Sequence, residues 1–122
     1  MNMRTNSGLS IYGIPNCDIT KKALGWLKDH SIDFAFHDYK KEGISKLKLE
    51  EWCKQVGWEN LLNKKSSTWR GLTVGEQASV TNKVAAIKIM MENNSIIKRP
   101  VIEAENKLIV GFKEENYSKQ LK

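Results

Sequence analysis

Residues 9–27, LSIYGIPNCDITKKALGWL, predict a strand, a tight loop and a helix in direct succession. The stretch begins with apolar and aromatic residues, passes through the turn formers Gly13, Pro15 and Asn16, and continues with apolar residues at helical spacing. These apolar residues are Ile19, Ala23, Trp26 and Leu27. The fold of the whole chain is predicted around this unit.

Cys17 lies where the predicted loop becomes the predicted helix. Unpaired backbone N–H groups and the positive end of the helix dipole favour a thiolate there. Helix N-termini and nearby cations lower a cysteine pKa from about 8.5 to roughly 3.5–7.5. Lys21 and Lys22 act in that direction, whereas Asp18 opposes them. Cys17 is therefore a candidate nucleophile, and the alternative is a small half-buried cysteine at a helix start.

The length of 122 residues suits one domain with its own hydrophobic core. The sequence has no N-terminal apolar run typical of a signal peptide and no stretch near the roughly 20 apolar residues that span a bilayer. Two cysteines, Cys17 and Cys53, do not form a disulfide framework of the secreted kind. We expect a cytoplasmic protein with no membrane partner.

The charge balance is basic, with 20 Lys and Arg against 14 Asp and Glu and a net charge of +6. This balance admits nucleic acid or an anionic small molecule as a partner. The lysines are scattered over several predicted elements without a long basic block. A solvated surface is favoured over nucleic-acid binding.

Residues 32–41, IDFAFHDYKK, predict a second strand, because apolar and polar residues alternate along them. One predicted face carries Ile32, Phe34, Phe36 and Asp38, and the other carries Asp33, Ala35, His37 and Tyr39. A strand, a helix and a strand in this order form a βαβ unit with parallel strands. Residues 1–8 are polar and are expected to form a dispensable flexible leader.

Residues 45–92 predict a mostly helical block. Ser45, Thr73 with Glu76, and Asn82 are predicted to cap helices. The predicted core-facing stripe of the first helix contains Leu49, Trp52, Cys53 and Val56. In the last helix, Val84, Ile87 and Met91 are predicted to form one face. Cys53 is thus interpreted as a buried, inert thiol rather than as a resolving cysteine.

Two β-rich segments, IIKRPVIEA (residues 96–104) and LIVGF (residues 108–112), predict a hairpin with a turn at residues 105–107. Residues 114–121 predict a short polar helix. Pro100 fits this pattern only at the first residue of a strand or in a special turn, for which a cis bond is one reason.

The order of these elements is similar to a thioredoxin-like α/β fold with a mixed four-stranded sheet and a helical insertion. The chain resembles the ArsC/Spx superfamily of arsenate reductase-like proteins, and within it the YffB-like branch. The resemblance covers residues 9–121 and rests on YGIPNCDITKKALGWL, FHDYKK, GWENLLNKKSSTWRGL and IIKRP. It implies a single thioredoxin-like domain over residues 9–122, with the insertion at about residues 45–92.

The resemblance implies that Cys17 is the attacking thiolate and that Pro100 lies beside it in cis. It further implies that Arg99 and Arg70 bind an oxyanion or a thiol substrate, because guanidinium groups offer fixed donor forks. Asn16, Thr20 and Pro100 complete the predicted substrate- or thiol-binding set. The family's third arginine is missing: residues 109–113 contain Lys113 but no arginine.

The Spx-like C-x-x-C switch is also missing, since Thr20 stands where the second cysteine would be. The Thr20 hydroxyl is either a donor to the thiolate or an exposed helix-surface group. A monothiol route follows, in which glutathione or another small thiol acts as co-substrate. No bound cofactor and no metal are expected, since His30 and His37 lack ligand-type partners at metal spacing.

Two functions of different classes are consistent with these residues. The first is a thiol-dependent, glutathione-linked reductase whose Cys17 forms a mixed disulfide or an adduct with an oxyanion such as arsenate. The alternative is a non-enzymatic Spx-like regulator that binds RNA polymerase, and a fold that has lost its catalytic function is a third possibility. A monomer is expected in each case.

Overall fold

The computed structural model describes residues 9–105 and 107–121, which form two compact units. The sheet unit contains the described residues up to Asp38 and from Arg99 onward, and the helical unit spans Tyr39–Lys98. The predicted leader, Asn106 of the predicted turn and Lys122 lie outside the described residues. A single domain over residues 9–122 stays a prediction.

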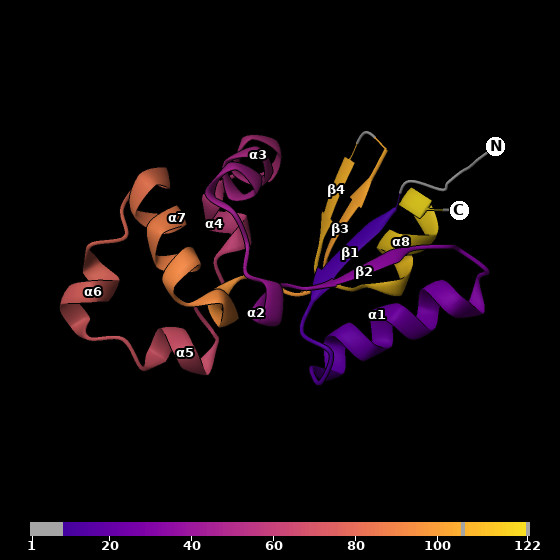
Figure 1. The fold of residues 1–122 in the computed structure, drawn as a ribbon, viewed down its shortest axis with the longest axis horizontal. Coiled ribbons are helices and arrows are strands. Elements are labelled where there is room, and N and C mark those ends of the chain that lie inside the picture. Colours follow the sequence, from indigo (N-terminus) through magenta and orange to yellow (C-terminus); the bar gives the residue numbers. More distant parts are fainter. Residues whose placement is uncertain (1–8, 106, 122) are drawn as a thin grey trace. The chain divides into compact units, whose positions relative to one another are not determined.

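The sheet unit contains a mixed four-stranded sheet in the order β2-β1-β3-β4 (Figure 1). Its strands are β1 (Ser10–Gly13), β2 (Ala35–Asp38), β3 (Val101–Ala104) and β4 (Lys107–Val110). β1 pairs with β2 in parallel, and both β1–β3 and β3–β4 are antiparallel. This sheet confirms the predicted thioredoxin-like α/β fold.

One face of the sheet is covered by two helices, α1 (Asp18–Asp29) and α8 (Glu114–Leu121). Ile11, Ile102 and Ile109 lie opposite one another in register and point to this face. The aromatic rings of Trp26 and Tyr117 meet edge to face, with centroids 5.4 Å apart. Buried residues of this core are Ile11, Ala23, Trp26, Leu27, Ile102, Ile109 and Tyr117.

The second strand is shorter than predicted and ends at Asp38. Phe34 and Phe36 pack against the core, as the predicted alternation requires. Tyr39 instead begins the short helix α2 (Tyr39–Glu42), and its buried hydroxyl donates to the Ile97 carbonyl at 3.1 Å. Alternation alone does not define where a strand ends, because a buried aromatic residue fits the pattern in either structure.

The helical unit confirms the predicted helical block. Besides α2, its helices are α3 (Lys46–Val56), α4 (Trp58–Leu61), α5 (Ser67–Arg70), α6 (Val74–Ala78) and α7 (Lys83–Glu92). Ser45 and Asn82 accept backbone N–H groups at helix starts, and Thr73 forms a capping box with Glu76. No helix among the described residues has both the length and the apolar character needed to cross a membrane.

The predicted apolar face of α7 is buried only in part. Val84 and Met91 are exposed, at 74% and 43% of their surface, whereas Ala86, Ile87, Ile89 and Met90 are buried. Apolar residues occur on every side of the KVAAIKIMM run, so its spacing does not select one face. Packing within the helical unit selects it instead.

The first arm of the hairpin also begins later than predicted. Ile96 lies in a 3₁₀ turn (Asn94–Ile96), and Ile97 forms an isolated bridge with Leu62. β3 begins at Val101, directly after Pro100. Proline has no N–H for a ladder hydrogen bond, so its place just before the strand agrees with the sequence expectation.

A matched pair of substitutions in α3 tests the core of the helical unit. Leu49 is fully buried and Leu47 is 78% exposed. We expect Leu49→Ala to lower the free energy of unfolding by about 2–5 kcal/mol, because it leaves a cavity. Leu47→Ala should change it by less than about 0.5 kcal/mol. Urea denaturation followed by circular dichroism measures both, and equal losses would contradict the packing described.

Candidate active site

Cys17 is the N-cap residue of α1 and is half-buried. Its backbone N–H donates to the Ile14 carbonyl at 3.1 Å, and its own carbonyl accepts from the Lys21 N–H at 3.0 Å. These two bonds fix the turn that leads from β1 into the helix. The sulfur therefore lies at the positive end of the helix dipole, as predicted.

Arg99 is brought to Cys17 by the pairing of β1 with β3. Val101 lies opposite Tyr12 in this antiparallel pair, so the residues just before β3 lie near the end of β1. The Nε–H of Arg99 donates to Cys17 Sγ at 3.3 Å. The Arg99–Pro100 peptide bond is cis, which confirms the expectation from the resemblance.

The pKa of Cys17 is lowered below that of an ordinary thiol. Partial burial is the largest single influence and raises the pKa, but it is outweighed by the hydrogen bond from Arg99, by the backbone and hydroxyl of Thr20, and by the charge of Arg99. The chief groups that lower this pKa are thus Arg99 and Thr20, not the predicted Lys21 and Lys22. An arginine is a durable source of this effect because it stays charged at all physiological pH values.

Thr20 is fully buried, so the alternative of an exposed helix-surface threonine is wrong. Its hydroxyl oxygen has no hydrogen-bond partner among the described residues that meets the usual geometry. Although the hydroxyl lowers the pKa of Cys17, we therefore treat it as a nearby dipole rather than as a formed hydrogen bond to the sulfur. A hydroxyl rotates freely, so it is available as a donor to a thiolate.

Gly13 is a site residue that the sequence did not reveal. It is predicted as a turn former but is the last residue of β1. A Cβ at this position would lie 2.9 Å from both Cγ2 and Oγ1 of Thr20. The missing side chain of Gly13 therefore provides the space in which Thr20 is buried. The only sign of this role in the sequence was a glycine directly after the residues predicted as the first strand.

Other predicted binding residues have the following positions. Asn16 is exposed in the loop before Cys17, and Pro100 is buried directly after Arg99. Arg70 is exposed and is the last residue of α5 in the helical unit. The binding roles of Asn16, Pro100 and Arg70 stay predictions.

Cys53 is buried in α3, and burial raises its pKa. The predicted burial of Cys53 is confirmed, and its inertness stays a prediction that the raised pKa supports. The histidines make aromatic contacts instead of forming a cluster: His30 stacks on Trp26 and His37 stacks on Tyr12, with ring centroids 4.0 and 4.6 Å apart. Within residues 9–105 and 107–121, no group of three or more His, Cys, Asp or Glu side chains is placed to hold a metal.

The family model described as the ArsC family matches residues 12–120. The chain belongs to the ArsC family. Among its relatives, the global transcriptional regulator Spx 2 of Lactococcus lactis is 33% identical over 110 residues, which cover 88% of this chain and 81% of the relative. ArsC-family membership and Spx homology together confirm the resemblance stated above.

Two solved structures of similar sequence extend this likeness to three dimensions. The YFFB protein is 38% identical with a TM-score of 0.89, and the match covers 93% of this chain and 99% of that one. An arsenate reductase (ArsC) related protein from Brucella melitensis is 44% identical with a TM-score of 0.75, covering 96% and 97%. The chain therefore has the arsenate reductase-like fold of its family.

Arg99→Gln should raise the pKa of Cys17, because it removes both a hydrogen bond and a positive charge from the sulfur. The pH dependence of iodoacetamide alkylation measures this pKa as a midpoint. Lys22→Gln is the control, since it removes one charge from the same part of α1 without touching the Arg99 contact. A shift in the control as large as that in Arg99→Gln would contradict the assignment.

Thr20→Val should raise the pKa of Cys17 by less than Arg99→Gln does, because it removes only the hydroxyl. It should also increase the free energy of unfolding by about 1–3 kcal/mol, since a buried hydroxyl without a partner is lost. Thr20→Ser retains the hydroxyl and serves as the control for the pKa. Alkylation profiles and urea denaturation test the two effects separately, and a lower midpoint in Thr20→Val would oppose this account.

Proposed function

We propose that this ArsC-family protein is a thiol-dependent reductase in which Cys17 is the nucleophile and glutathione is the resolving thiol. The observation that supports the proposal is the 3.3 Å contact from Arg99 Nε to Cys17 Sγ at the start of α1. A cation and a helix N-terminus at one sulfur favour the thiolate, which is the form that attacks disulfides. A reducing cytoplasm would supply the glutathione.

In the first step, the Cys17 thiolate attacks the glutathione sulfur of a mixed disulfide between glutathione and a substrate thiol. A bond forms between Cys17 and glutathione while the substrate disulfide breaks. The substrate leaves as a thiolate and takes a proton from water. Arg99 is positioned to stabilise negative charge on the sulfur of Cys17 before the attack.

In the second step, the thiolate of a second glutathione attacks the glutathione sulfur bound to Cys17. Oxidised glutathione leaves, and the Cys17 thiolate is regenerated. The second glutathione is the reductant, because the sulfur of the first is already at the oxidation level of a disulfide in the mixed disulfide. An external thiol is needed because Asp18, Ile19 and Thr20 provide no second cysteine near Cys17, and Cys53 is buried.

An oxyanion such as arsenate is the second substrate class for the same thiolate. Arg99 would donate to its oxygens, with Arg70 as a predicted further donor. The segment after β4 offers Lys113 in place of the family's third arginine. A lysine is a point charge without the bidentate fork, so we place disulfides ahead of arsenate.

The test is turnover of a cysteine–glutathione mixed disulfide with added glutathione. The formation of oxidised glutathione is measured as the consumption of NADPH by added glutathione reductase. Cys17→Ala should reduce the rate at least about 100-fold, because the nucleophile is removed. Cys53→Ala should retain the rate, because this thiol takes no part.

Mass spectrometry of the quenched reaction should find glutathione on Cys17. Equal activity of wild type and Cys17→Ala, or turnover without that adduct, would overturn the proposal. A small loss confined to Cys53→Ala would report damage to packing rather than to chemistry.

A further inference from the structure

The sheet unit carries a second feature close to the candidate active site. A hollow of about 450 Å³ lies where β4 ends and α8 begins. This volume lies within the usual range of small-molecule pockets, about 300–1,000 Å³. The apolar wall comes from Val110, and the polar groups come from Lys113, Glu115, Asn116 and Lys119.

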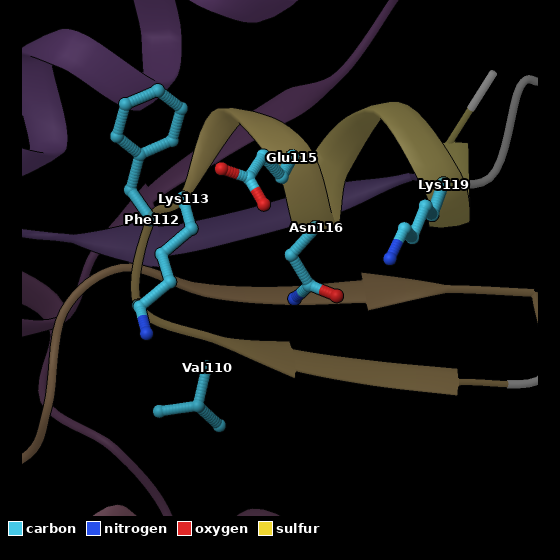
Figure 2. Close-up of a pocket in the computed structure, with 7 residues that line it drawn as sticks. Val110, Phe112, Lys113, Glu115, Asn116 and Lys119 are labelled. Atoms are coloured by element: carbon cyan, nitrogen blue, oxygen red, sulfur yellow. The ribbon is translucent and has the colours of Figure 1, made fainter.

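The polar groups of the hollow are mainly donors. Figure 2 shows Lys113, Asn116 and Lys119 extending toward one side of the hollow, on which Val110 also lies, while the ring of Phe112 points away. The Asn116 Oδ1 accepts from Gln120 Nε2 at 3.1 Å. The amide N–H groups of Asn116 are therefore the groups that would donate to a ligand. Two ammonium groups and one amide donor favour a carboxylate-rich ligand.

Gly111 connects this hollow to the segment that carries Arg99. It lines the hollow, and its N–H donates to the Pro100 carbonyl at 2.8 Å. Pro100 directly follows Arg99, the donor to Cys17 Sγ. Gly111 at the wall of the hollow is therefore hydrogen-bonded to Pro100, and Pro100 is adjacent in the chain to Arg99, which contacts Cys17.

The wall at Gly111 is preformed and open. The Tyr117 hydroxyl donates to the Gly111 carbonyl at 2.7 Å, so both backbone polar groups of Gly111 are held. Its φ of +86° is a conformation that favours glycine, and a Cβ there would meet no atom within 4 Å. The backbone of Gly111 is thus left uncovered where the hollow meets the segment that contains Pro100.

We propose that this hollow binds the carboxylate-bearing end of the thiol co-substrate, with Lys113 and Lys119 as its charged anchors. The proposal rests on the proposed function for its choice of ligand. Glutathione carries two carboxylates and one ammonium group, and the hollow offers two lysines and one glutamate, so the charges are complementary. A compact oxyanion would leave most of this volume empty.

The test uses the full chain and the double variant Lys113→Gln/Lys119→Gln. The control is Lys28→Gln/Lys88→Gln, which removes the same charge from exposed positions outside the hollow. The probe is S-methylglutathione, which retains every charged group but cannot exchange disulfides, so its binding is measured independently of turnover. NMR titration should show shifts at residues 110–119.

We expect the double variant to weaken the binding of S-methylglutathione about fivefold, which is the size expected for two exposed ion pairs. The control should bind like the wild type. The preference for glutathione over 2-mercaptoethanol as resolving thiol, compared by kcat/KM, should fall by a similar factor, because 2-mercaptoethanol has no carboxylate. Equal affinity of the two double variants, or no shifts at residues 110–119, would overturn the inference.

The two proposals fail in distinguishable ways. If no thiol supports turnover but S-methylglutathione binds at residues 110–119 and loses affinity in the double variant, the reductase fails and the binding site stands. If turnover depends on Cys17 but the double variant and its control behave alike, the reductase stands and the binding site fails.

Discussion

The hydrogen bond from Arg99 Nε to Cys17 Sγ is the interaction on which the candidate site depends. It joins residues 82 positions apart in the sequence. Burial of the sulfur by itself disfavours the thiolate, so a half-buried nucleophile needs a compensating charge. Arg99 supplies both a donor and a positive charge, and a guanidinium stays ionised throughout the physiological pH range.

The sheet makes this contact possible by placing the ends of β1 and β3 together. Two glycines near this edge leave space that a side chain would otherwise fill. Gly13 leaves the space that Thr20 fills, and Gly111 leaves its backbone uncovered next to Pro100. The site is therefore determined as much by absent side chains as by the charged ones.

Features that depend on neighbours along the chain were predictable. The caps at Ser45, Thr73 and Asn82 and the start of α1 at Cys17 follow from short patterns whose hydrogen bonds span three residues or fewer. Features that depend on packing were not. Tyr39 was expected in a strand, and Val84 was grouped on one helix face with Ile87, yet Val84 is exposed and Ile87 is buried. Apolar character alone does not say which neighbour will cover a side chain.

The sequence by itself determined the strand, loop and helix of residues 9–27, the helix caps and a cysteine at a helix start, because these result from periodicity and local capping. The mixed four-stranded sheet was expected from the resemblance to a thioredoxin-like fold. Only the tertiary structure decided that Arg99 is the cation at the sulfur and that Thr20 is buried beside it. The physical reason for the first result is that β3 must lie against β1, and strand pairing joins segments that are far apart in the sequence. The second result depends on how closely Thr20 of α1 packs against Gly13 at the end of β1, which the residue pattern does not show.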